Sequence, residues 1–302
     1  MWIYLAFMSA CMLGIYDVFK KTSLKDNAVI PVLFLNTIFC SLLFLPLIIA
    51  SRIAPETMAD TIFYVPKVSF TTHLYIVLKA AIVLASWLFA YFALKHLPIT
   101  LASPMKAAQP MLTLTGAILV FGERLNIYQW VGITVALTAF FLLSRSGKKE
   151  GIQFTNNKWV WSMVLSVVTG SMSGLYDKYL MQYLQFDRLA VQALFNYYQV
   201  AIMALIMMFI WFPNRSKTTP FQWRWSIIFI SVFLVCADFV YFYALSDQNA
   251  LISVVSLIRR SGVIVSFIAG WIFFKEKNIK GKAFNLSLVL IAMLLLYYGS
   301  QL

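Results

Sequence analysis

Three basic residues lie inside long apolar stretches of the chain, where charged side chains are rare. Lys106 stands within residues 98–121, and Arg259 and Arg260 stand within residues 250–274. A cation inside a membrane costs on the order of a few kcal/mol, so it usually faces a watery cavity or an acidic partner. Arginine presents a planar fork that fits phosphate or carboxylate oxygens, and lysine adds a compact positive charge. These residue types predict a binding site for an anion.

The spacing of these cations is repeated between the two halves of the chain. Lys106 lies 153 residues before Arg259, and Ser103 lies 153 residues before Ser256. If symmetry relates the halves, Lys106 and Arg259 approach each other, and two like charges side by side need an anion between them. Arg259 and Arg260 point about 100° apart on a helix, so one can bind a substrate while the other pairs with the protein.

Acidic residues in the apolar stretches allow a second interpretation. Asp17, Asp177 and Asp238 could neutralise the cations internally, and shifted span ends would instead move the cations to the membrane surface. Asp17 and Asp177 each follow a tyrosine, Tyr16 or Tyr176, about three-quarters of the way along an apolar stretch. These two pairs predict gates at opposite faces of a cavity, proton sites for coupling, or interfacial side chains. Asp238 is a candidate partner of the arginines or a protonation site.

Other side chains in the apolar stretches are weaker candidates. Asn36 and Asn196 are amides within expected helices, where hydrogen bonds between helices or the lining of a cavity are typical roles. Trp87 is a candidate cavity residue, although aromatic residues in membrane helices more often pack against their neighbours. Glu123 and Glu276, each beside a basic residue at the end of an apolar run, predict structural contacts at the turns into the following spans.

The composition places these residues in a membrane protein. The 302-residue chain is 62% hydrophobic and 12% charged, with a mean hydropathy of +0.82, which excludes an ordinary soluble domain. A helix needs roughly 20 apolar residues to cross a bilayer, and long unbroken runs favour helices over a β-barrel. The sequence predicts spans at residues 3–21, 31–51, 74–94, 98–121, 127–144, 159–180, 190–212, 224–245, 250–274 and 281–299.

A duplication organises these spans. Residues 14–17 and 174–177 both read glycine, aliphatic residue, tyrosine, aspartate, and the same offset of 160 residues carries Asn36 onto Asn196. Five spans per half is an odd number, so the second half enters the membrane from the opposite side. The predicted fold is an all-α integral membrane protein with ten transmembrane helices, arranged as two inverted five-helix repeats around a central cavity. The repeats are expected at residues 1–146 and 159–302, joined by a loop at 147–158.

The net charge of +13 comes largely from basic residues near the expected span ends, which favours a membrane topology over nucleic-acid binding. More of them follow odd-numbered spans, including Lys20, Lys21 and Lys282. By the positive-inside rule this bias predicts that both termini lie outside. Three cysteines inside apolar runs and two histidines near span ends predict neither a disulfide framework nor a metal centre.

Three motifs, taken in order and with the duplication, carry a family resemblance. Residues 14–20 (GIYDVFK), 119–125 (LVFGERL) and 130–133 (WVGI) resemble the drug/metabolite transporter superfamily, in particular the bacterial EamA-type permeases. The resemblance covers essentially the whole chain. It implies a basket of helices around a cavity, alternating access and no ATP, with substrates that range from sugar phosphates and nucleotide sugars to amino acids. Lys275 departs from the family pattern, which has a glycine before the glutamate.

The basic residues also resemble the pattern of the plastid sugar-phosphate translocators, in which a lysine and a basic doublet hold the phosphate. Only Lys106, Arg259 and Arg260 match that pattern. The resemblance therefore implies that these three residues bind the substrate.

Together these features predict a secondary active transporter that moves a small polar, anionic or phosphorylated metabolite by alternating access. We expect a bacterial inner-membrane protein without a cofactor, whose partners are a small-molecule substrate, the lipid bilayer and a coupling proton or counter-substrate. The alternatives are an exporter of amino acids or other metabolites and a lipid-linked sugar flippase. A membrane enzyme is disfavoured because the sequence has no P-loop and no HExxH motif. The expected substrate-binding residues are Lys106, Arg259, Arg260, Tyr16, Asn36, Tyr176, Asn196 and Trp87, and the expected coupling or gating residues are Asp17, Asp177 and Asp238.

Overall fold

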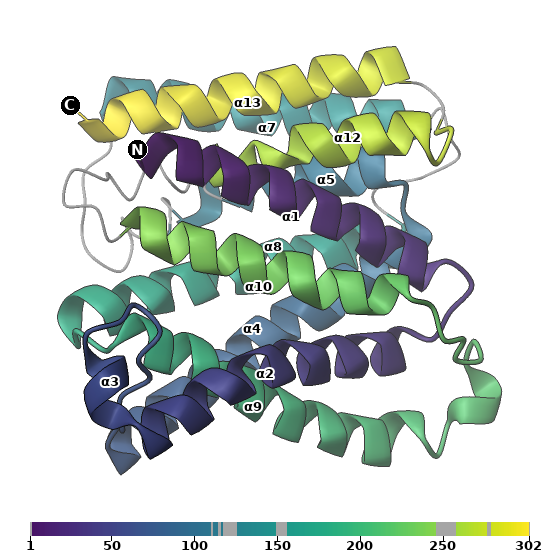
Figure 1. Cartoon of the computed structure of the whole chain (residues 1–302). Helices are drawn as coiled ribbons and strands as arrows, with labels where there is room; N and C mark the ends of the chain where they lie inside the picture. Colours follow the sequence, from purple (N-terminus) through teal and green to yellow (C-terminus); the bar gives the residue numbers. More distant parts are fainter. Residues whose placement is uncertain are drawn as a thin grey trace.

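The computed structural model describes residues 2–109, 111–113, 116, 126–148, 156–245, 258–276 and 279–301. Throughout these ranges the regular elements are helices (Figure 1). The α-helices are α1 (Trp2–Leu24), α2 (Val29–Ile53), α3 (Pro55–Ala59), α4 (Phe70–His96), α5 (Ile99–Ala107), α7 (Ile127–Lys148), α8 (Lys158–Lys178), α9 (Arg188–Ile206), α10 (Ser226–Leu245), α12 (Gly262–Ile272) and α13 (Ile279–Gln301). Two π-helical turns, η1 (Tyr179–Tyr183) and η2 (Met207–Trp211), follow α8 and α9, and a short 3-10 turn, η3 (Arg215–Lys217), comes next.

The helices coincide with the predicted spans where both can be compared. The predicted spans 98–121 and 250–274 are described only in part, by α5 and α12, and the remainder lies largely outside the described residues. The short helix α3 was not predicted. Four helical stretches in the described ranges are long and apolar enough to cross a membrane: Val29–Ile53, Phe70–His96, Arg188–Trp211 and Ile279–Gly299.

Side-chain caps fix the starts of several helices. The Ser69 hydroxyl accepts a hydrogen bond from the Thr72 amide at 3.2 Å, so α4 begins earlier than its apolar run suggests. Asp187 caps α9 by accepting a hydrogen bond from the Ala190 amide at 2.8 Å. Such caps satisfy backbone donors that a helix leaves unpaired in its first turn.

Helices of one half pack mainly against helices of the other half. In Figure 1, α7 and α13 lie together at one edge of the molecule, and α2 and α9 cross at the opposite edge. Between these edges α1 packs against α10 and α12, while α8 packs against α4 and α5. Thus α1 contacts the third and fourth expected spans of the second half, and α8 contacts the third and fourth expected spans of the first half.

Two glycines let α1 and α12 approach backbone to backbone. A Cβ atom added at Gly14 would lie 2.6 Å from the Gly262 carbonyl oxygen and 2.4 Å from the Val265 Cβ. A Cβ atom at Gly262 would lie 2.3 Å from the Ala10 carbonyl oxygen. Only glycine fits at such distances. This contact holds the residues just before α12 against the middle of α1.

Three of the lysines near the expected span ends make contacts inside the protein. Lys20 and Lys282 are buried. Lys21 donates hydrogen bonds to the carbonyl oxygens of Leu94 and Leu97 at 2.7 and 2.5 Å. These lysines therefore join helices to one another, and the side of the membrane on which they lie stays a prediction.

Candidate functional site

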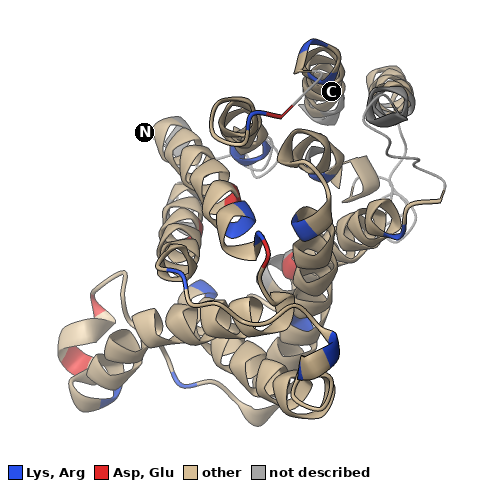
Figure 2. Ribbon diagram, turned by 90° about the vertical axis from the view of Figure 1, so that its right-hand side faces the viewer, with Lys and Arg blue, Asp and Glu red and all other residues tan. Residues whose placement is uncertain are grey.

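A cavity lined by several charged and polar residues lies between α1, α5 and the start of α12. Its volume is about 50 Å³, which is room for a few water molecules. Figure 2 shows basic and acidic positions on helices near the centre of the molecule as well as at its periphery. The cavity is lined by Leu13, Tyr16, Asp17, Ser103, Lys106, Arg259, Arg260, Gly262 and Val263. Five of the predicted site residues therefore lie together, although they are distant in sequence.

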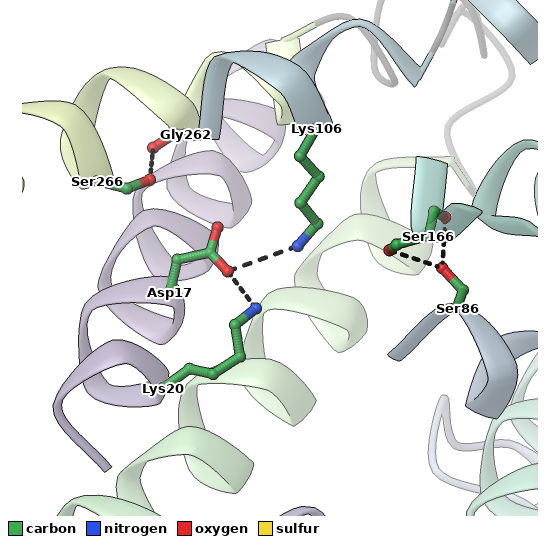
Figure 3. A network of polar contacts seen from close by, with 7 residues as sticks. All are labelled: Asp17, Lys20, Ser86, Lys106, Ser166, Gly262 and Ser266. Carbon is green, nitrogen blue, oxygen red and sulfur yellow. Dashed lines mark hydrogen bonds and ion pairs between the residues drawn. The ribbon is translucent and has the colours of Figure 1, made fainter. Parts of the chain in front are cut away.

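The Asp17 carboxylate joins two lysines at this cavity (Figure 3). One of its oxygens, Oδ1, accepts a hydrogen bond from Lys20 Nζ at 2.5 Å and contacts Lys106 Nζ at 3.5 Å. Lys20 lies one turn further along α1, and Lys106 comes from α5. The acid thus links the two helices and neutralises part of their positive charge.

Lys20 is held in an aromatic environment. Its ammonium group lies 4.3 Å from the centre of the Tyr16 ring and 5.3 Å from that of the Tyr91 ring. A cation over an aromatic face is stabilised by the ring quadrupole, more so away from water. From the sequence, Lys20 was counted only among the basic residues that indicate membrane topology, and this role was missed. The available signal was its spacing, because position i+3 on a helix faces the same side as Asp17.

The two arginines of the doublet have different surroundings. Arg259 forms an ion pair with Asp238 of α10, and its guanidinium carbon lies 4.2 Å from the centre of the Tyr241 ring. Arg260 lines the cavity and has no ion pair with another residue of the described ranges. This division agrees with the expectation that one arginine pairs with protein and leaves the other available.

The second tyrosine–aspartate pair lies in another contact. Asp177 of α8 forms an ion pair with Lys79 of α4, and the Tyr176 hydroxyl donates a hydrogen bond to the Tyr75 carbonyl oxygen at 3.2 Å. Neither Tyr176 nor Asp177 lines the cavity described above. Lys79 was missed, although a lysine within the apolar run 74–94 was a visible signal.

The remaining candidates make their contacts away from the cavity. Asn36 Oδ1 accepts a hydrogen bond from the Ser231 hydroxyl at 2.9 Å, which links α2 to α10. Asn196 donates to the carbonyl oxygen of Gln192 within its own helix at 2.8 Å. Trp87 packs against the largest apolar cluster. None of the three lines the cavity.

Glu276 caps the helix that carries Lys106. Its carboxylate accepts hydrogen bonds from the backbone amides of Ile99 and Thr100 at 2.7 and 3.0 Å, and from the Thr100 hydroxyl. Lys282 donates to that same hydroxyl at 2.9 Å. We expected Glu276 to make a structural contact at the turn into the following span. It instead binds the start of α5, which belongs to the other half. Its counterpart Glu123 lies outside the described residues.

The comparison with known families can be set beside this geometry. The family model described as "EamA-like transporter family" matches residues 1–145 and 157–298, which is nearly the whole chain in two copies. The chain belongs to the EamA-like transporter family. It is therefore a transporter of the drug/metabolite type and an integral membrane protein, and a small molecule and the lipid bilayer are its partners. The family consists of transporters rather than enzymes.

Solved structures show the same fold. Among 26 matching chains, one crystal structure, described only as that of a protein, shares 15% identity and a TM-score of 0.58 with this chain. The match covers 95% of this chain and 96% of the other. At this identity the likeness shows the fold alone. No curated protein matches the chain.

Proposed function

We propose that this EamA-family member is a secondary active transporter of a small anionic, in particular phosphorylated, metabolite. The observation that carries the proposal is the charge of the cavity. Lys106, Arg259, Arg260 and Asp17 line it, while Lys20 pairs with Asp17 and Asp238 pairs with Arg259. Four basic groups against two acidic ones leave two positive charges uncompensated among the described residues. Such an excess at membrane depth favours a bound anion.

The same charges support a choice between the two arginines. Arg260 is the first residue that we propose for substrate binding, because its guanidinium fork faces the cavity without an acidic partner among the described residues. Lys106 is the second, because its acidic partner among the described residues, Asp17, lies at the limit of hydrogen-bond distance, 3.5 Å. Arg259 then positions the doublet through Asp238.

Alternating access is supported by the size of the cavity. About 50 Å³ holds a few waters but not a sugar phosphate. A substrate can enter only if helices around the cavity move apart. We propose that ten spans in two inverted repeats provide this motion, because the contacts of α1 with α10 and α12 correspond to those of α8 with α4 and α5. A bacterial inner membrane is the proposed location, and a proton or counter-substrate the proposed coupling partner.

An exporter of amino acids is the second candidate function. One observation favours it: the Asp17 carboxylate lines the same cavity as Arg260. A zwitterion could place its carboxylate on the arginine and its ammonium group on Asp17. The phosphorylated anion is preferred because the described charges are in excess positive rather than balanced.

Counterflow in proteoliposomes tests the proposal. Vesicles that contain the wild type and are loaded with unlabelled phosphate esters should take up radiolabelled phosphate ester. In the double variant Arg259→Ala/Arg260→Ala this uptake should fall at least about tenfold, because charge-assisted contacts to the substrate are lost. Arg215→Ala is the matched control, because Arg215 is exposed in η3. Transport that survives the double replacement would contradict the site, and uptake of amino acids alone would favour the second candidate.

A further inference from the structure

Asp17 occupies the place between cations where the proposed function puts a substrate anion. Its Oδ1 atom accepts from Lys20 Nζ at 2.5 Å and from Lys106 Nζ at 3.5 Å, while the Oδ2 atom has no partner among the described residues (Figure 3). A single carboxylate oxygen therefore faces two ammonium groups at once.

The two contacts differ in strength and in exposure. The Lys20 side chain is 2% exposed and comes from the same helix one turn away, so its bond to Asp17 is local and shielded from water. The Lys106 side chain is 31% exposed and comes from another helix, at a distance that is long for a charge-assisted hydrogen bond. Asp17 is thus committed to Lys20 and holds Lys106 loosely.

Lys20 has closer aromatic compensation than Lys106. Its ammonium group lies over the Tyr16 and Tyr91 rings at 4.3 and 5.3 Å, whereas Lys106 is 5.8 Å from the Tyr16 ring. When Lys106 turns toward the cavity, the Asp17–Lys20 pair remains neutral and enclosed. The geometry therefore allows Lys106 to exchange one anionic partner for another without exposing a buried charge.

We propose that Asp17 is an internal counter-anion that competes with the substrate for Lys106. In the empty protein Asp17 partly neutralises Lys106, and in the loaded protein the anionic group of the substrate takes Lys106 and Arg260 while Asp17 stays with Lys20. This role rests on the proposed function. In this role Asp17 lowers the affinity for the substrate. It leaves less uncompensated positive charge in the empty site, so the substrate binds less tightly than it would bind to the cations alone.

Titration with inorganic phosphate tests this role. The melting temperature of the purified protein in detergent, followed against phosphate concentration, gives an apparent affinity, because a ligand of the folded state raises its stability by mass action. In Asp17→Asn we expect phosphate to bind more tightly than in the wild type, by about tenfold, a size typical of coupling between groups in one site. Glu56→Gln, at an exposed acid of α3, changes the net charge equally and should leave the affinity unchanged.

The double variant Asp17→Asn/Lys20→Met guards against misfolding, because Asp17→Asn alone leaves the buried Lys20 without its acid. It removes the local pair as a unit and frees Lys106, so phosphate should again bind more tightly than in the wild type. Equal or weaker binding in the folded Asp17 variants, with binding intact in the wild type, would overturn the role of Asp17 alone. Failure of phosphate to bind the wild type and both Asp17 variants would contradict the proposed anion site, and this role with it.

Discussion

At the residue scale, the acids within the helices are matched with cations but are not equally protected. The three aspartates that the sequence placed within spans each form an ion pair with a basic side chain. In the Asp177–Lys79 pair the acid is 43% exposed and the lysine 8%. The cost of losing a partner therefore depends on which side chain is left behind, since a buried charge without a partner is far costlier than a solvated one.

Replacing either partner of this pair should give unequal results. Asp177→Asn strands the buried Lys79 ammonium group and should lower the free energy of unfolding by about 1–3 kcal/mol. Lys79→Met leaves a half-exposed carboxylate that water can solvate, and should cost less than about 1 kcal/mol. Thermal or denaturant unfolding in detergent measures both. Equal losses, or a larger loss for Lys79→Met, would contradict the asymmetry.

The site cations were predictable from the sequence, and so were the acids that could pair with them, but not which acid meets which cation. Lys106, Arg259 and Arg260 stand out because charges are rare in apolar runs. Asp17 and Asp238 were candidate partners for the same reason, but the pairing depends on which helices are neighbours, and no spacing within one helix reveals that. The role of Lys20 was missed because a cation near the end of a span resembles an interfacial anchor.

At the element scale, the contact between α1 and α12 brings the arginine doublet to the tyrosine–aspartate motif. Gly14 lies three residues before Asp17, and Gly262 two residues after Arg260. Their backbones approach so closely that an added Cβ atom would overlap the facing carbonyl oxygen. The repeated motif has a glycine at both positions, Gly14 and Gly174. Among the described residues, however, a Cβ atom at Gly174 would meet the Thr113 side chain, with the nearest atom at 3.8 Å, an ordinary contact.

The duplicated glycines therefore provide a matched pair of substitutions. Gly14→Ala should force α1 and α12 apart and lower the free energy of unfolding by about 1–3 kcal/mol, as overpacking does. Gly174→Ala should be tolerated within about 0.5 kcal/mol or stabilise α8, because alanine favours a helix. Melting temperatures of the two variants, measured in one detergent, compare them directly. A Gly174→Ala protein that is the less stable of the two would refute this reading of the contact.

At the scale of the whole molecule, the two halves depend on each other. The packing of α1 on α10 and of α4 on α8 joins helices from different halves (Figure 1). The cavity is itself shared, since Asp17 and Lys106 come from the first half and Arg259 and Arg260 from the second. Sequence duplication indicated two related halves, and the family match in two copies agrees with it. How deeply the halves interlock could not be predicted, because similar motifs do not reveal which surfaces meet.

The proposed inverted topology has a direct consequence for the membrane sides. Five spans in each half put both termini on one side and the loop between the halves, expected at residues 147–158, on the other. Reporter domains fused to the N-terminus and to the C-terminus should therefore report the same side of the membrane. A reporter inserted in that loop should report the opposite side. A segment between the halves that reports the same side as the termini would contradict the inverted arrangement.

The central proposal is that the cavity beside Asp17 binds a phosphorylated anion through Arg260 and Lys106. A thermal-shift screen of the purified protein tests this binding most directly. The screen compares inorganic phosphate, sugar phosphates, nucleotide sugars and amino acids on the wild type, Arg260→Ala and the exposed control Arg215→Ala. We predict that phosphorylated compounds raise the melting temperature of the wild type and of Arg215→Ala but not of Arg260→Ala. Stabilisation by amino acids alone, or by phosphorylated compounds equally in all three proteins, would contradict the claim.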